Sequence, residues 1–190
     1  VPLFVDGSLV LGDSFEIMEH ADRVGVGALL GTDDPKVRAW PARIEPALQE
    51  ARARVTRAIL ADPEALTEAA ASATPRFAAS LFRPLAAAGA RHVAKKYGFG
   101  VDGEVERATT EGVLDALRAA IGDGPYVEDA FSAADLCAVS LLQGIRPVEG
   151  GVPLDPATRR AWTDEPLAAR YADLLAWRDG IFERHWPSPR

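Results

Sequence analysis

An acid–serine pair, Asp13-Ser14, is the strongest candidate for ligand chemistry in the sequence. Apolar residues follow it at helical spacing from Phe15 to Ala21, so we expect a helix to begin at this pair. The first turn of a helix has free N–H groups and the positive end of the helix dipole, and it therefore favours a bound carboxylate. A serine in this place is also an ordinary helix cap. The two roles are compatible, and the residues alone leave both open.

The residues ahead of the pair predict a β-hairpin that must position it. Two short apolar runs, 1–5 and 8–11, are separated by Asp6-Gly7, which tolerates the positive φ angles of a tight turn. Pro2 lacks a backbone donor, so it belongs at a strand start or where a ligand takes over the hydrogen bonding. Because an isolated hairpin is marginally stable in water, we expect this one to pack on another part of the fold or on a partner.

Strand signals are absent after residue 34, and helical signals dominate. The glycine-rich residues 25–34 are interpreted as a linker, closed by Pro35 at a first helical position. We expect Pro41 and Pro46 to bend the first helix, and Pro84 and Gly89 to kink the third. The segments expected to be helical are Pro35–Leu60, Pro63–Ala71, Pro75–Tyr97, Glu104–Ile121, Ser132–Gly144 and Glu165–His185.

Ser132 and Asp135 predict a capping box at the start of one of these helices. The Ser132 side chain can accept from a backbone N–H three residues on, while Asp135 reaches back to the N–H of Ser132. Phe131, just ahead of the cap, can pack on Leu136. The residues that follow carry almost no charge, so we expect a buried central helix and interpret this motif as one that serves folding.

Composition excludes several classes of function. The formal net charge of −7 argues against a broad nucleic-acid-binding surface, which would need a basic domain. The single cysteine, Cys137, excludes an internal disulfide framework and fits a reducing, cytoplasmic setting. No apolar run reaches the roughly 18 residues of a membrane-spanning helix.

The other reactive and aromatic residues give weaker signals. Cys137 lies in an apolar helix and is interpreted as a buried thiol rather than a nucleophile. The three histidines are too scattered for a set of metal ligands, so no metal is expected. The basic run 91–96 predicts a solvated helix face rather than an anion site. Four aromatic residues fit the hydrophobic core, or alternatively a cleft for an acceptor substrate: Trp40, Phe77, Phe82 and Tyr97.

Several stretches together resemble the glutathione transferase superfamily. The resemblance to its buried-helix motif lies in PYVEDAFSAADLCAVSLL, residues 125–142. Its last long helix is similar to YADLLAWRDGIFERHWP, residues 171–187, and the helix that opens its second domain is similar to DDPKVRAW, residues 33–40. The end of its thioredoxin-like domain resembles VPLFVDGSLVLGDS, residues 1–14. The resemblance covers essentially the whole chain.

The resemblance implies a mainly α fold in which residues 1–24 end a thioredoxin-like α/β domain with a β-hairpin and a helix. Residues 25–34 are then a linker, and residues 35–190 an all-helical glutathione transferase C-terminal domain. In the family the X-Pro bond is cis, and the main chain before it pairs with the cysteinyl part of glutathione; Val1 and Pro2 match these positions. The serine hydroxyl and backbone bind the γ-glutamyl carboxylate; Ser14 matches, with Asp13 beside it.

The resemblance places no catalytic residue in this chain. The family's thiol-activating Tyr, Ser or Cys lies upstream of the Val-Pro pair, so we expect a βαβ unit ahead of Val1. What is implied is an enzyme that transfers the thiol of glutathione, its co-substrate, to a small hydrophobic electrophile. It would be a cytoplasmic homodimer with no metal and no nucleic-acid or membrane partner. The alternative is a non-catalytic member that serves as a dimerisation or interaction module.

Overall fold

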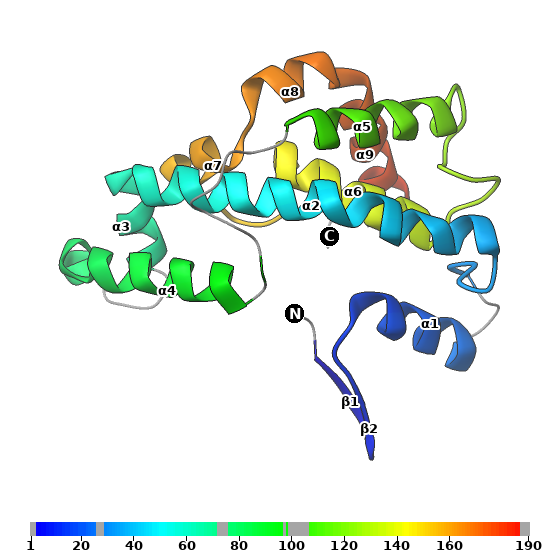
Figure 1. Cartoon of the computed structure of the whole chain (residues 1–190), viewed down its shortest axis with the longest axis horizontal. Helices are drawn as coiled ribbons and strands as arrows, with labels where there is room; N and C mark the ends of the chain where they lie inside the picture. The colour runs from blue at the N-terminus through cyan, green and yellow to red at the C-terminus, as the bar shows by residue number, and fades with distance from the viewer. Residues whose placement is uncertain (1–2, 26–28, 72–75, 97, 99–106, 187–190) are drawn as a thin grey trace.

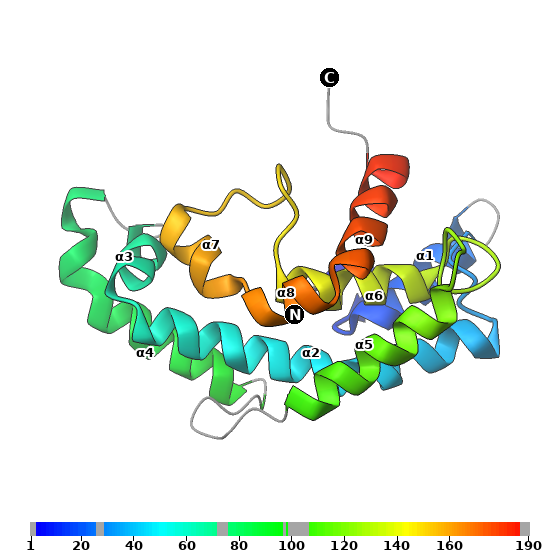
Figure 2. The same ribbon diagram turned by 90° about the horizontal axis from the view of Figure 1, so that it is seen from above.

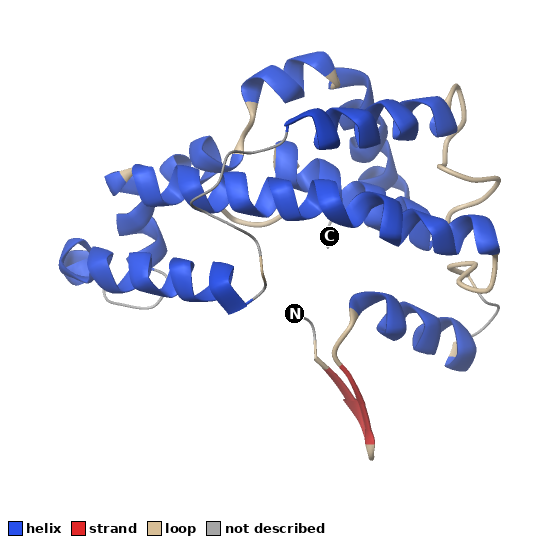
Figure 3. Ribbon diagram, viewed as in Figure 1, coloured by secondary structure: helices blue, strands red, loops and turns tan. Residues whose placement is uncertain are grey.

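The computed structural model describes residues 3–25, 29–71, 76–96, 98 and 107–186 of the 190-residue chain. This part is mainly helical, as expected, and its only strands are the two of a short hairpin (Figure 3). The predicted ligand residues Val1 and Pro2 lie outside the described residues, as do Pro75 and Tyr97.

The hairpin consists of β1 (Phe4–Asp6) and β2 (Leu9–Leu11). The strands are antiparallel, and Asp6 pairs with Leu9. The turn is therefore Gly7-Ser8, one residue later than the predicted Asp6-Gly7. Gly7 has a φ of 58°, a value that glycine adopts without steric cost, and this fixes it as the first residue of the two-residue loop.

The next three helices begin and end close to the predicted residues. α1 (Ser14–Val24) follows the hairpin, and α2 (Pro35–Ala61) follows the linker. The Asp34 side chain accepts from the backbone N–H of Lys36, so α2 begins with a side-chain cap. α2 runs through Pro41 and Pro46 as one element, and α3 (Pro63–Ala71) comes directly after it.

The predicted helix Pro75–Tyr97 is wrong as a single element. A 3₁₀-helix, η1 (Arg76–Phe82), is followed by the separate helix α4 (Arg83–Lys96). Pro84 explains the division, because proline has no N–H to donate and fits only the first turn of a helix. It is the second residue of α4. α4 then continues through Gly89 to Lys96.

The last third of the chain differs from the prediction in two places. α5 (Arg107–Ile121) and α6 (Ala133–Ile145) match predicted helices, except that the predicted start of α5 lies outside the described residues. α7 (Pro156–Trp162) was not predicted. The predicted helix Glu165–His185 is two helices, α8 (Glu165–Arg170) and α9 (Ala172–His185). They are separated by Tyr171, whose ψ of 35° departs from helical geometry.

α6 is the central helix of the core, and a capping box fixes its start. Asp135 is fully buried; it accepts from the backbone N–H of Ser132 at 2.8 Å and from that of Val127 at 2.9 Å. Ser132 Oγ in turn accepts from the backbone N–H of Ala134 at 3.3 Å. α2 packs along α6 on one side, and α5, α8 and α9 complete the enclosure (Figure 2). The cap thus orients the element around which the others assemble.

The hairpin and α1 lie on one side of α2, near its N-terminal end, and α4 lies on the same side near its C-terminal end (Figure 1). Figure 2 shows the same separation of α1 and α4 along α2. Across the described ranges, none of the helices has the length and apolar character needed to cross a membrane.

Candidate ligand-binding groove

A groove of about 1250 Å³ runs from the start of α1 along α2 to the end of α7. One wall at its α1 end is made by Asp13 and Ser14, two of the predicted ligand residues. α4 contributes Val93, and α7 contributes Trp162. Its apolar lining from α1, α2 and α6 includes Phe15, Met18, Ile44, Leu48, Val55 and Leu136. Apolar walls with a few polar groups are typical of small-molecule sites.

Asp13, rather than Ser14, is the cap of α1. Its Oδ1 accepts from the backbone N–H of Phe15 at 2.8 Å and from that of Glu16 at 3.1 Å. Ser14 is the first residue of the helix, and its side chain is exposed. Within the described part of the chain, the Ser14 hydroxyl has no hydrogen-bond partner. The cap interpretation of Ser14 is therefore wrong, and its hydroxyl is available at the groove.

Asp22 holds the linker against α1 through three hydrogen bonds. It accepts from the backbone N–H of Leu30 at 2.7 Å and from both the N–H and the hydroxyl of Thr32 at 2.9 Å. Burial raises the pKa of Asp22, but these hydrogen bonds to its charged form outweigh that effect and lower the pKa below the usual value. Asp22 thereby stabilises the position of α1 beside α2.

Arg38 of α2 adds a second connection to α1. It forms an ion pair with Glu19, donates to the carbonyl of Thr32 at 3.0 Å, and lies over the ring of Phe15. Cation–π contact and ion pairing both favour this arrangement. Sequence reasoning did not single out Arg38 or Asp22. The spacing of charged residues along the chain does not indicate which separate elements they will connect.

Two buried polar atoms at the groove residues have no hydrogen-bond partner among the described residues: Gln49 Oε1 and Trp162 Nε1. The Gln49 amide donates to Glu45, so its oxygen points the other way. An unpaired buried polar atom costs about 1–3 kcal/mol, and in native structures such an atom commonly binds water, an ion or a ligand, or serves catalysis. Sequence reasoning singled out neither residue.

Cys137 lines the groove from α6 and is half-buried. Burial, followed by the negative charges of Glu45 and Asp13, raises the pKa of its thiol to about 11. A thiol with this pKa is protonated at neutral pH, and only the thiolate is a strong nucleophile. This agrees with the interpretation of Cys137 as a structural thiol.

Alkylation of Cys137 by iodoacetamide at pH 7.5 is expected to be about a hundredfold slower than that of an ordinary thiol, because its pKa lies two units above 9.0. The rate should still rise about tenfold per pH unit between pH 8 and pH 10, since the thiolate fraction is still increasing there. Mass spectrometry of the folded chain, with the urea-unfolded chain as the control, measures both rates. A plateau near pH 9 in the folded chain would contradict the raised pKa.

The remaining candidates from the sequence divide between the core and the surface. Trp40 is buried in the core and donates to Glu128 at 2.8 Å, while Phe82 is exposed. Arg91 and His92 are exposed on α4, as expected for a solvated helix face. In the ranges that the structure describes, no cluster of three or more His, Cys, Asp or Glu side chains could hold a metal ion.

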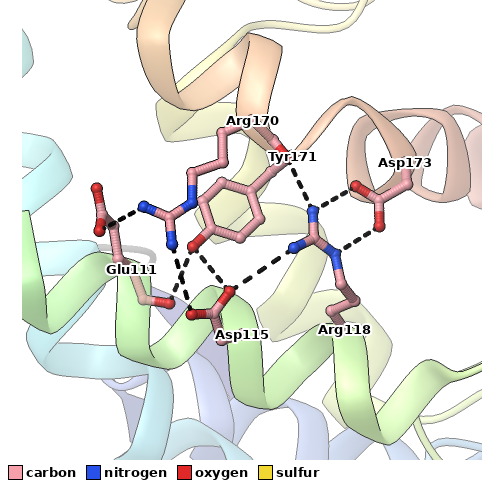
Figure 4. A network of polar contacts seen from close by, with 6 residues as sticks. All are labelled: Glu111, Asp115, Arg118, Arg170, Tyr171 and Asp173. Carbon is pink, nitrogen blue, oxygen red and sulfur yellow. Dashed lines mark hydrogen bonds and ion pairs between the residues drawn. The ribbon is translucent and has the colours of Figure 1, made fainter.

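A second polar cluster joins α5 to the junction of α8 and α9 (Figure 4). Arg118 donates to both carboxylate oxygens of Asp173, at 2.6 and 2.7 Å, and the Tyr171 hydroxyl donates to Asp115 at 2.9 Å. Burial and then the bond to Asp115 raise the pKa of Tyr171 to about 12, so the hydroxyl stays protonated. Since every group in the cluster is paired with another, we interpret it as a clasp between helices. The residues drawn are Glu111, Asp115, Arg118, Arg170, Tyr171 and Asp173.

Comparisons of the chain with models of protein families, with curated proteins and with solved structures found no match. The functional argument therefore depends on the groove and its residues.

Proposed function

We propose that the chain is part of a glutathione transferase-like protein that binds glutathione in the groove and joins its thiol to a small hydrophobic electrophile. The observation that carries the proposal is the position of Asp13 and Ser14 in the groove wall, with the Ser14 hydroxyl exposed and without a partner in the described part of the chain. The resemblance of residues 1–14 to a thioredoxin-like glutathione site assigns Ser14, with Asp13 beside it, to the γ-glutamyl carboxylate, and this supports the proposal.

Binding would begin with the γ-glutamyl carboxylate at the start of α1. The Ser14 hydroxyl and backbone N–H donate to the carboxylate, and the positive end of the α1 dipole favours its charge. Val1 and Pro2 would hold the cysteinyl main chain. The apolar residues of α2 and α6, such as Leu48 and Leu136, then face the electrophile. The groove is large enough for both molecules, because ligand pockets are commonly about 300–1,000 Å³.

The proposed reaction is a nucleophilic substitution. The thiol of glutathione loses its proton to solvent, the thiolate sulfur attacks the electrophilic carbon, and the leaving group departs with the bonding electron pair. Cys137 does not take the nucleophile's role, because burial keeps it protonated. The group that lowers the pKa of the glutathione thiol is proposed to lie upstream of Val1, as the resemblance implies.

Replacing Ser14 by Ala should weaken glutathione binding by about tenfold to a hundredfold, because a hydrogen bond to a charged group contributes about 1.5–3 kcal/mol. Isothermal titration calorimetry of the full-length protein with reduced glutathione measures the dissociation constant. Ser8→Ala is the matched control, since Ser8 is exposed in the hairpin turn and does not line the groove. Equal affinities for the two variants would remove Ser14 from the site, and an absence of binding by the unaltered protein would overturn the proposal.

One observation favours the alternative, a non-catalytic module of the same fold. The Asp13 carboxylate already accepts from the N–H groups of Phe15 and Glu16, so fewer free backbone N–H groups remain at the start of α1 to bind a ligand. Turnover separates the two functions. Conjugation of glutathione to an activated aryl halide by the full-length protein would support the enzyme, whereas glutathione binding without conjugation to a panel of electrophiles would support the module.

A further inference from the structure

The groove carries a group of polar side chains at its α7 end, away from the residues proposed to bind glutathione. α1 and α7 lie toward opposite ends of α2 (Figure 2). Ser14 lines the groove at the α1 end, whereas Trp162 lines it at the end of α7. Glutathione bound at Ser14 leaves the chemistry of the α7 end unexplained. The other polar lining residues come from the later parts of α2 and α6: Gln49, Arg52, Thr56, Ser140 and Gln143.

Close packing fixes three helices at this end of the groove. Arg54 of α2 donates to the carbonyl of Gly144 in α6 at 2.7 Å and to that of Trp162 in α7 at 2.6 Å. Gly144 lies so close to α2 that a Cβ atom added to it would be 3.0 Å from the Cβ atom of Ala51. Side chains from α2, α6 and α7 are therefore held on a rigid support, as a precise ligand site requires.

Three polar groups at this end have no hydrogen-bond partner among the described residues. Two are the buried atoms Gln49 Oε1, an acceptor, and Trp162 Nε1, a donor. The third is the side-chain NH2 group of Gln143, whose Oε1 accepts from the backbone N–H of Val148 at 2.7 Å. Ser140 differs, since its hydroxyl donates to a carbonyl one turn earlier in its own helix at 2.8 Å. The α7 end thus offers two kinds of donor and one acceptor that the described chain leaves unpaired.

We propose that the α7 end of the groove binds a secondary amide group of the electrophile. Trp162 Nε1 and Gln143 Nε2 donate to the amide carbonyl oxygen, which has two lone pairs, and Gln49 Oε1 accepts from the amide N–H. We call these three residues the amide subsite. The inference rests on the proposed function, because it names the substrate class of that reaction: electrophiles that carry an amide at a distance from the reacting carbon.

An amide fits the amide subsite better than a carboxylate or an ester does. A carboxylate and an ester both offer acceptors only, so each leaves the Gln49 oxygen without a donor. A carboxylate would also need a cation. Arg52 lines the same end of the groove, but it is paired with Glu45 at 3.2 Å. The amide supplies both the acceptor and the donor that the three residues lack.

Access to the amide subsite requires a small movement of side chains. Gln49 Oε1 and Trp162 Nε1 are shielded from water, so a ligand reaches them only when a neighbouring side chain turns aside. Gln49 is half-buried, and its side chain makes one hydrogen bond, to the exposed residue Glu45, so turning it breaks a single bond. A ligand that cannot donate to Gln49 gains nothing in return, and such buried groups reject analogues that leave them unpaired.

Two matched probes test the amide subsite apart from catalysis. N-methyl-3-nitrobenzamide and methyl 3-nitrobenzoate differ in that an ester oxygen replaces the amide N–H, and neither has a leaving group for glutathione to displace. Isothermal titration calorimetry of the full-length protein measures both dissociation constants. We expect the amide to bind at least about tenfold more tightly than the ester, because only the amide pairs with Gln49.

Two variants separate the donor from the acceptor. Gln49→Leu removes the acceptor, so the amide and the ester should bind about equally. Trp162→Phe removes the donor to the carbonyl, which both probes carry, so both should bind about threefold to tenfold more weakly with the preference for the amide kept. Ser140→Ala is the matched control in the groove, because its hydroxyl is paired within α6, and it should change neither constant. Circular dichroism of each variant establishes that the helices are intact.

Equal affinity of the unaltered protein for the two probes, or no binding of either, would overturn the inference. So would a preference for the amide that survives Gln49→Leu. Conjugation separates this inference from the proposed function, when glutathione is offered the corresponding 4-chloro compounds and rates are divided by those without protein. Conjugation that favours neither compound would overturn the amide subsite and leave the proposed function intact. Binding that favours the amide, without any conjugation, would support the subsite and overturn the proposed function.

Discussion

Replacing Asp135 by Ala is expected to lower the free energy of unfolding by about 3 kcal/mol or more. Asp135 is fully buried and accepts from the backbone N–H groups of Val127 and Ser132 and from the Ser132 hydroxyl. Removing the carboxylate leaves these buried donors without a partner, and each unsatisfied buried group costs about 1–3 kcal/mol. Equilibrium unfolding in urea, followed by circular dichroism, measures the change.

Two further variants test whether the effect arises from the capping box. Asp123→Ala makes the same substitution at an exposed loop residue and should leave the unfolding midpoint nearly unchanged. Ser132→Ala removes only one member of the box and should cost about 1 kcal/mol. If Asp135→Ala unfolded at the same urea concentration as Asp123→Ala, the capping box would not contribute to the stability of α6.

Local signals in the sequence were sufficient to predict the beginnings of several helices. Asp34-Pro35 combines a capping side chain with a proline at the first helical position, and α2 begins there. Ser132 and Asp135 stand three residues apart because a capping box requires that spacing, and the structure has the box. In these cases all the interacting groups lie within one turn of the chain, so a short window contains the whole interaction.

The break at Tyr171 could not be predicted in this way, because its cause lies far away in the sequence. No glycine or proline marks the position. The side chain of Tyr171 is buried, and its hydroxyl donates to Asp115 at 2.9 Å and lies 3.2 Å from the carbonyl oxygen of Glu111 on α5. These tertiary contacts accompany the departure from helical geometry that separates α8 from α9.

By contrast, α7 was missed although Asp155-Pro156 is a start signal of the same kind as Asp34-Pro35.

The candidate groove was predicted only in part for the same reason. Asp13 and Ser14 stand out because an acid–serine pair at a helix start has a local meaning. Val93 and Trp162 come from α4 and α7, and only the packing of these helices around α2 brings them to the groove. Sequence periodicity shows which face of a helix is apolar, but it does not show which other helix that face will meet.

The end of α6 depends on Arg178 of α9, and replacing this residue by Leu is expected to lower the free energy of unfolding by about 3 kcal/mol. Arg178 is 2% exposed and donates to the carbonyls of Leu142 and Arg146. The Leu142 carbonyl also accepts from the backbone N–H of Arg146 at 3.1 Å, whereas the Arg146 carbonyl lies past the last residue of α6 and has no N–H of this helix to pair with. It also donates to Asp179, whose carboxylate balances its charge.

Leucine fills part of the space of Arg178 but donates no hydrogen bond, so the lost stability reports mainly on the two carbonyls. Arg178→Lys keeps the positive charge but places it on a single nitrogen. It should recover only part of the free energy of unfolding that Arg178→Leu loses, because lysine cannot reproduce the planar fork of arginine. Arg146→Leu is the control at the same helix end, since the Arg146 side chain is exposed while its backbone carbonyl remains in place. Urea unfolding of the three variants should therefore rank them Arg146→Leu, Arg178→Lys, Arg178→Leu in order of decreasing stability. The reverse order for the two Arg178 variants would mean that burying the charge costs more than its hydrogen bonds return, as happens for some buried ion pairs.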